Sequence, residues 1–299
     1  MSINQFERIL ARRLPTNFAK DFYPRAMRRL AEYGLFREEH IVDTDYDFKI
    51  AADRLDAVKW YIYYYGFFEP QISIAWKNFL QEGDAVLDIG ANIGYHTLLA
   101  SKLVGETGRV YSVEPGSMIY KQLKKNIELN NIKNITPIRK AISDHPGEAN
   151  LYYAGDNMQG SSSLIAQDGK PFDRVECITF EMLAHEVDLD KIRLIKIDVE
   201  GLEGEVIRGM TSCLDRVHQD TAIFIEISPE NAGRAQEILS PLKRCGFHSR
   251  MIENEYRTKF YRDTKGVHLL PEEFSPGRIA DIVLTRNEKV FDYLETGRS

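Results

Sequence analysis

The sequence has little cysteine and no long apolar stretch. Its 299 residues include three cysteines, and their wide separation excludes a disulfide framework or a cysteine-based zinc site. No apolar run is long enough to cross a bilayer, and the first residues lack the apolar core of a signal peptide. We also find no internal repeat. These absences favour a globular protein of a reducing compartment, and we expect a cytoplasmic location.

Basic residues are concentrated at the N-terminus. The whole chain carries a net charge of −6, but residues 1–30 hold seven basic and two acidic side chains, so this segment is +5 and the remainder −11. Such a segment is typical of a solvated helix face, and the alternative is contact with an anionic membrane surface or a lipid-linked substrate. We expect no nucleic-acid binding, because the acidic remainder would repel phosphate. The sequence does not indicate an oligomeric state.

Strand and helix patterns alternate from residue 85 onwards, except for a polar loop predicted between the third strand and Ser163. This alternation predicts an α/β fold: a Rossmann-like, doubly wound, mostly parallel sheet with helices on both faces. The predicted strands are Ala85–Asp88, Val110–Val113, Ile135–Arg139, Arg193–Ile197 and Ala222–Ile227, and the predicted helices are Tyr95–Leu103, Ser117–Asn130, Phe180–His185, Gly204–Met210 and Asn231–Cys245.

The first 80 residues predict an N-terminal helical cap, and residues 81–299 the α/β domain, with a C-terminal insert around 248–280. Residues Trp60–Phe68 are strongly aromatic, which indicates core beneath the cap or, as an alternative, a stacking wall for a ligand. The cap is expected to contain helices at Phe6–Leu14, Asp21–Tyr33 and Ile72–Leu80 and a strand or hairpin at Ile41–Ala51.

A glycine-containing loop follows the first predicted strand of the α/β domain. Asp88 precedes Gly90, Asn92 and Gly94, and a second strand leads to Glu114. A carboxylate at that spacing grips ribose hydroxyls in nucleotide-binding folds, so the pattern predicts a nucleoside-containing cofactor. A dinucleotide needs a second and a third glycine for its pyrophosphate, but Asn92 occupies the middle position and no third glycine follows.

The motifs taken together resemble the FkbM family of S-adenosylmethionine-dependent methyltransferases. The resemblance rests on Asp88–Thr97, on Ser161–Leu164 and on Ile197–Glu203, and it extends from Gly66 to Met210. It implies a class I methyltransferase domain that uses S-adenosyl-L-methionine. It also suggests a hydroxyl acceptor on a sugar, a glycan or glycolipid, or a secondary metabolite, and it places Glu69 near the mouth of the cofactor site.

Polar residues directly after strands are the candidate site residues, because ligands of open α/β sheets bind there. We expect Asp198 or Glu200 to act as the catalytic base, with a structural helix cap as the alternative for either. Asp198 is also expected at the cofactor, together with Ala141, Ile142 and Ser143 near the adenine. His96, Ser161, Ser162 and Glu226 are candidate acceptor-binding residues. Asp198 and Glu226 could share a magnesium ion, but we expect no metal.

The sequence therefore predicts a methyltransferase that transfers a methyl group from S-adenosylmethionine to a hydroxyl oxygen. A nicotinamide-dependent oxidoreductase is the first alternative, because it would share the strand, glycine loop and Glu114. A non-catalytic module that retains only the nucleoside pocket is the second.

Overall fold

The computed structural model describes residues 39–53, 57–153, 162–163, 173–253, 258–275 and 278–298. The predicted helices Phe6–Leu14 and Asp21–Tyr33, and with them the basic segment 1–30, lie outside the described residues. The predicted hairpin is confirmed: β1 (His40–Asp43) and β2 (Lys49–Ala52) pair antiparallel.

An eight-stranded sheet forms the centre of the molecule, in the order β13-β12-β14-β11-β10-β3-β4-β5. The pairs from β11 through to β5 are parallel, while β14, β12 and β13 pair antiparallel with their neighbours. The strands are β3 (Ala85–Ile89), β4 (Arg109–Val113), β5 (Ile135–Ile138), β10 (Ile192–Ile197), β11 (Ala222–Ile227), β12 (His248–Ile252), β13 (Leu269–Leu270) and β14 (Ala280–Thr285). This sheet confirms the predicted Rossmann-like fold class.

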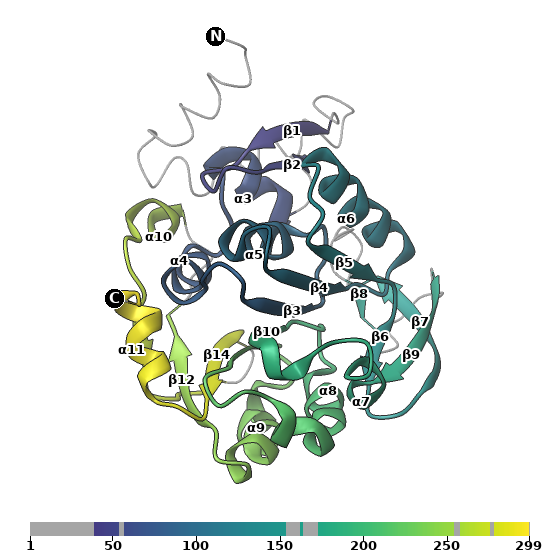
Figure 1. Ribbon diagram of the computed structural model, residues 1–299, viewed down its shortest axis with the longest axis vertical. Helices are drawn as coiled ribbons and strands as arrows, with labels where there is room; N and C mark the ends of the chain where they lie inside the picture. The colour runs from purple at the N-terminus through teal and green to yellow at the C-terminus, as the bar shows by residue number, and fades with distance from the viewer. Residues whose placement is uncertain are drawn as a thin grey trace.

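Helices cover both faces of this sheet (Figure 1). Successive side chains of a strand point to opposite faces, so Val86 packs in one apolar cluster and Leu87 in the other. The first cluster includes residues of α4 (Pro70–Phe79), α5 (Tyr95–Val104), α6 (Ser117–Leu129) and α11 (Lys289–Thr296), and the second includes residues of α7 (Phe180–Leu183), α8 (Glu203–Met210) and α9 (Ala235–Arg244). The continuous apolar runs of the central strands follow from this double burial.

The strand order reverses between β3 and β10. From β3 the chain continues outwards through β4 and β5, whereas β10 is followed by β11 on the other side. The loops after these two strands therefore diverge and leave a crevice at the carboxyl edge of the sheet, which is where doubly wound folds bind ligands.

The prediction of a polar loop up to Ser163 was wrong. Much of this segment forms strands of a second sheet, in the order β6-β9-β7-β8. Its strands are β6 (Ala141–Ser143), β7 (Gly147–Tyr153), β8 (Ser162–Ser163) and β9 (Asp173–Thr179). They cover a small apolar cluster that contains Leu151 and Val175. The strands were missed because β7 contributes one fully buried apolar side chain among polar neighbours, a signal too weak to predict a strand from the sequence.

The C-terminal segment adds to the main sheet. Residues 248–280, expected as an insert, supply β12 and β13 and the helix α10 (Thr258–Asp263). The helix α11, which was not predicted, packs against α4. Within the part of the chain that the structure describes, every helix is too short or too polar to span a bilayer.

Candidate active site

Two cavities meet at the crevice between β3 and β10. We call the smaller one, of about 60 Å³, the Glu114 cavity, and the larger one, of about 340 Å³, the Glu226 cavity. Four residues line both: Gly90, Asn92, Asp198 and Glu200. A ligand in one cavity can therefore lie against a ligand in the other at the ends of the two central strands.

Gly90 allows the loop after β3 to pass close to the loop after β10. Its φ of +86° is in the left-handed region, and a Cβ atom there would lie 1.7 Å from the backbone oxygen of Asp198. The Asp198 amide also donates to the Ile89 carbonyl at 2.9 Å. We expected this glycine to admit a ligand, but it is required first by the contact between two backbone segments. Gly94 lines neither cavity and instead begins α5 against Leu123.

Glu114 lies at the end of β4, and its carboxylate is held by backbone amides. Oε2 accepts a hydrogen bond from Asn92 at 3.0 Å, and Oε1 accepts one from Gly116 at 2.9 Å. Burial raises the pKa of Glu114 to about 7, although both backbone hydrogen bonds act to lower it. The two contacts fix the carboxylate at the wall of the Glu114 cavity, and its remaining lone pairs can accept from a diol.

Of the three residues after β5 that were predicted to lie near the adenine, two line the same cavity. Ala141 and Ile142 line it, together with Val113 and Leu151, whereas the buried Ser143 does not. Apolar side chains of this kind suit the faces of a purine ring. Of the predicted hydroxyl-rich loop, Ser161 lies outside the described residues, and Ser162 is described only by its backbone pairing with Tyr153.

The three carboxylates after β10 lie in two different environments. Asp198 and Glu200 line both cavities, and Glu200 has a φ of +49°, a strained backbone conformation for a non-glycine residue. Glu203 is buried and holds the turn instead: it accepts hydrogen bonds from the Gly201 amide at 2.9 Å and from Asn231 at 2.5 Å. Glu203 therefore stabilises the turn after β10.

Lys196 is a residue that sequence reasoning missed. It lies inside β10, is 5% exposed and donates to Asp198 Oδ2 at 2.7 Å. Burial lowers its pKa, but the carboxylates of Asp198, Asp88 and Glu69 outweigh that effect and raise it overall. A lysine between two isoleucines of a predicted central strand was the available signal, because a buried lysine requires partners.

Asp88 lies in β3, two residues before Gly90, and lines the Glu226 cavity. Its Oδ2 atom accepts a hydrogen bond from Thr97 at 2.6 Å, while Oδ1 is buried without a hydrogen-bond partner among the described residues. Burial raises its pKa. Sequence reasoning placed Asp88 at the cofactor, and in the structure it lines the Glu226 cavity but not the Glu114 cavity.

The predicted acceptor residues His96 and Glu226 line the Glu226 cavity, and so does Glu69. Glu69 begins α4 with a φ of +42°, and its backbone amide donates to the Tyr261 hydroxyl at 3.2 Å. Burial and nearby Lys196 lower the pKa of His96 well below its usual value, so this imidazole is neutral at pH 7. Burial, followed by the charges of Asp198, Asp281 and Glu69, raises the pKa of Glu226 well above its usual value.

The aromatic segment divides between the two roles that we considered. Tyr63, Tyr64 and Tyr65 are buried in the apolar core. Tyr61 and Phe68 instead line the Glu226 cavity, and Tyr61 stacks on Tyr261 of α10 with ring centroids 4.2 Å apart. The segment therefore supplies both core and cavity wall.

The residues at this crevice fit S-adenosylmethionine. The Glu114 carboxylate can receive the ribose hydroxyls, and the apolar wall beside it can receive the adenine. Asp88, whose buried Oδ1 atom has no hydrogen-bond partner among the described residues, lines the adjoining Glu226 cavity, so a donor whose positively charged methionine end contacts Asp88 would extend from the Glu114 cavity into it. A dinucleotide fits less well, because Asn92 occupies the position where a pyrophosphate requires bare backbone.

Comparisons with known proteins indicate a methyltransferase. Residues 88–249, more than half of the chain, match the model of the methyltransferase FkbM domain. The chain is similar to the hexuronic acid methyltransferase AglP of Haloferax volcanii, with 25% identity over 46% of this chain and 54% of that protein. A protein-L-isoaspartate O-methyltransferase of Methanosarcina mazei is 41% identical over 23% of this chain and 29% of its own length.

Among solved structures, TYW2 of M. jannaschii in complex with AdoMet aligns with a TM-score of 0.41 and 16% identity, over 83% of this chain and 84% of that chain. The chain spans about half the length of AglP and less than a third of the isoaspartate methyltransferase. The domain match, in contrast, includes the glycine loop, Glu114 and the acidic motif after β10. The chain thus belongs to the FkbM family of methyltransferases, whose methyl donor is S-adenosyl-L-methionine.

Proposed function

We propose that this protein transfers a methyl group from S-adenosylmethionine to a hydroxyl oxygen of a saccharide or another polyhydroxylated metabolite. The observation that carries the proposal is the shared lining of the two cavities by Asp198 and Glu200. A donor bound in the Glu114 cavity and an acceptor bound in the Glu226 cavity would meet at these two carboxylates.

In this proposal Asp198 is the base. S-adenosylmethionine supplies an electrophilic methyl group, whose bond to sulfur breaks as the acceptor oxygen bonds to carbon, leaving S-adenosylhomocysteine. Asp198 accepts the hydroxyl proton, and Lys196, bonded to its Oδ2 atom at 2.7 Å, fixes the orientation of the carboxylate. Glu200 positions the acceptor hydroxyl. The protein contributes alignment and a route for the proton.

The chemistry of the Glu226 cavity supports a neutral acceptor rich in hydroxyl groups. Carboxylates line its walls, and Tyr61 and Phe68 offer aromatic rings on which a sugar can stack. AglP, to which the chain is similar, is a hexuronic acid methyltransferase, which supports a saccharide acceptor. An acceptor that itself carries carboxylates or phosphates would be repelled here, and this favours neutral sugars over hexuronic acids and nucleic acids.

The proposal is tested by mass spectrometry of neutral, acidic and amino saccharides incubated with the protein and a deuterated methyl donor. We expect a gain of one labelled methyl group on a hydroxyl of a neutral sugar. The matched variant Asp198→Asn should lower kcat by about 100-fold, because it removes the base. Its affinity for S-adenosylhomocysteine should stay within about threefold of the wild-type value. Methylation at nitrogen or carbon, or full activity of Asp198→Asn, would contradict the proposal.

The two alternative functions are separated by simpler measurements. Calorimetry with S-adenosylhomocysteine and with NAD distinguishes a methyltransferase from an oxidoreductase, and we expect heat of binding only with the former. The non-catalytic module is distinguished by turnover with the labelled donor. The family match and Asn92 count against the oxidoreductase.

Contact with a membrane or a lipid-linked acceptor through the basic segment 1–30 remains a separate part of this proposal. Its support is the charge of the segment, +5 against −11 for the rest. Cosedimentation with anionic and neutral vesicles tests it, and binding that is equal for both would contradict it.

A further inference from the structure

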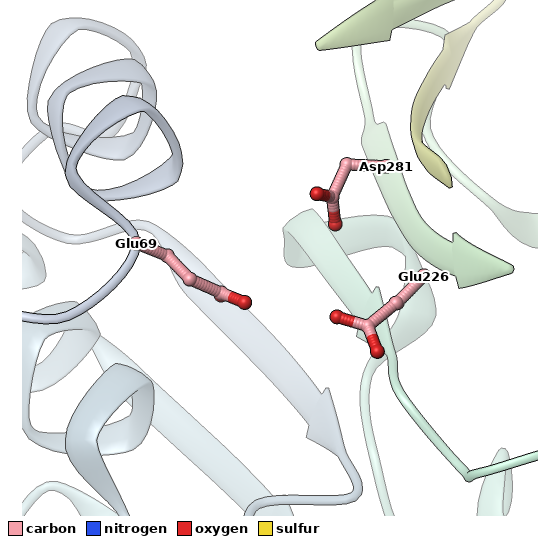
Figure 2. Close-up of side chains that lie close together, drawn as sticks. All are labelled: Glu69, Glu226 and Asp281. Carbon is pink, nitrogen blue, oxygen red and sulfur yellow. The ribbon is translucent and has the colours of Figure 1, made fainter. Parts of the chain in front are cut away.

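Three carboxylates from distant parts of the chain converge at the Glu226 cavity. One oxygen each of Glu69, Glu226 and Asp281 can be chosen so that all lie within 4.8 Å of one another. Figure 2 shows Glu69 reaching from the start of α4 towards Glu226 and Asp281 on neighbouring strands. Asp281 was not predicted as a site residue.

The fold holds these acidic side chains together. In the antiparallel pair of β11 and β14, Glu226 lies directly opposite Asp281. Like charges at directly opposed positions destabilise a sheet, and Asp281 is 7% exposed and Glu69 2% exposed, so solvent screens them poorly. Each of the three makes further interactions in the structure.

A second observation comes from His96. Its Nε2 atom is buried, has no hydrogen-bond partner among the described residues and lies 3.5 Å from Glu69 Oε2. Two ligands of a tetrahedral metal ion, each about 2.1 Å from it, lie about 3.4 Å apart. A neutral imidazole nitrogen beside carboxylate oxygens is a common ligand set for a divalent ion.

We propose that Glu69, Glu226 and Asp281 bind a divalent metal ion at the acceptor end of the site, beside the His96 Nε2 atom, for which the described part of the chain offers no hydrogen-bond partner. This site differs from the Asp198–Glu226 pair that the sequence offered, and it replaces our expectation of no metal. Carboxylate oxygens with an imidazole nitrogen beside them favour Mn²⁺ or Zn²⁺ over Ca²⁺.

An ion here would neutralise the acidic wall against which the acceptor binds. If the proposed function holds, its open positions would bind acceptor hydroxyl oxygens, and a metal-bound hydroxyl loses its proton more readily. This role depends on the proposed function, but binding of the ion does not.

The experiment is a titration of the full chain, after treatment with a chelator, with Mn²⁺, followed by calorimetry and electron paramagnetic resonance. We expect one ion per chain. Asp281→Asn and Glu69→Gln should each weaken binding by about tenfold or more. His96→Ala should weaken it less and alter the resonance spectrum. Asp188→Asn, which changes an exposed carboxylate away from the cavities, is the matched control and should bind as wild type.

Retained binding of S-adenosylhomocysteine shows that each variant is folded. Lack of Mn²⁺ and Zn²⁺ binding by the wild type would overturn the proposal, as would equal affinity of the wild type and both carboxylate variants. Binding of glucosamine in the same calorimetric titration, without any binding of a metal ion, would also overturn the proposal, because it would indicate a site for an organic ammonium group. None of these readouts uses turnover, so failure of the metal site is distinguishable from failure of the proposed function.

Discussion

The two cavities of the active site are built in different ways. The Glu114 cavity has an apolar wall that includes Val113, Ala141, Ile142 and Leu151, and its one deeply buried carboxylate, Glu114, accepts hydrogen bonds from two amides. The Glu226 cavity is lined by several carboxylates, with Lys196 as their buried cation. The first can bind a ligand by preformed hydrogen bonds, whereas the second is charged and depends on compensating ions.

The difference extends to the segments that form each cavity. The Glu114 cavity is built from segments that follow neighbouring parallel strands of the main sheet, together with Leu151 of β7. The Glu226 cavity also draws on the start of α4, on β11 and on Ile279 before β14, segments about 200 residues apart in the chain.

Substitution of one lysine at each cavity should give the largest difference in stability. Lys196→Met should lower the free energy of unfolding by about 3–5 kcal/mol, because it leaves buried carboxylates without their cation. Lys140→Met, at the Glu114 cavity, should change it by less than about 1 kcal/mol, since Lys140 pairs with the exposed Glu176. Urea denaturation measures both. Equal effects would show that the two cavities are electrostatically alike.

Gly90 is shared by the cavities, so its substitution should damage both. Gly90→Ala forces a Cβ atom against the Asp198 backbone and should cost about 3 kcal/mol of stability, with loss of cofactor binding. Gly83→Ala is the control. The φ of Gly83, +90°, is also in the left-handed region, but a Cβ atom there would lie 3.7 Å from Thr107 Oγ1. That change should cost only about 1–2 kcal/mol. Thermal melts of the two variants that coincide would contradict the proposed backbone contact.

Cofactor affinity should depend on one cavity more than on the other. Glu114→Ala should weaken binding of S-adenosylhomocysteine by about 100-fold, or about 2.7 kcal/mol, through loss of charged hydrogen bonds to the ribose. Glu226→Gln should leave this affinity within about twofold. Calorimetry provides both values, and an unchanged affinity of Glu114→Ala would remove the ribose role.

The smallest expected effect is on pH dependence. The pKa of Glu114 is about 7 because of burial, and the ribose requires the ionised form, so affinity for S-adenosylhomocysteine should fall about tenfold from pH 8 to pH 6. The free energy of unfolding of the ligand-free protein should instead rise as the pH is lowered. Because the folded pKa is raised, the folded state holds an extra proton between pH 4.5 and 7, and stability falls as pH rises through that window. In Glu114→Gln, this contribution to the pH dependence should be absent both from the affinity for S-adenosylhomocysteine and from the free energy of unfolding.

Sequence reasoning performed best where a motif and its ligand site are contiguous. Gly90, Asn92 and Glu114 follow predicted strands, and the parallel sheet brings the ends of those strands to one edge. It failed for β7, whose single buried leucine gives no clear period, and for α11, which is stabilised by packing on α4. It assigned Gly94 and Ser143 to the site because of their neighbours in sequence, but neither lines a cavity.

What the sequence by itself determined is the α/β fold, the family and its cofactor, because these depend on periodicity and on residues within a few positions of a strand end. The tertiary structure alone decided that Lys196 lies opposite Asp88 in the β10–β3 pair and that Asp281 joins Glu69 and Glu226. These encounters depend on strand order and register, which bring together side chains from elements far apart in the chain. No local pattern encodes them.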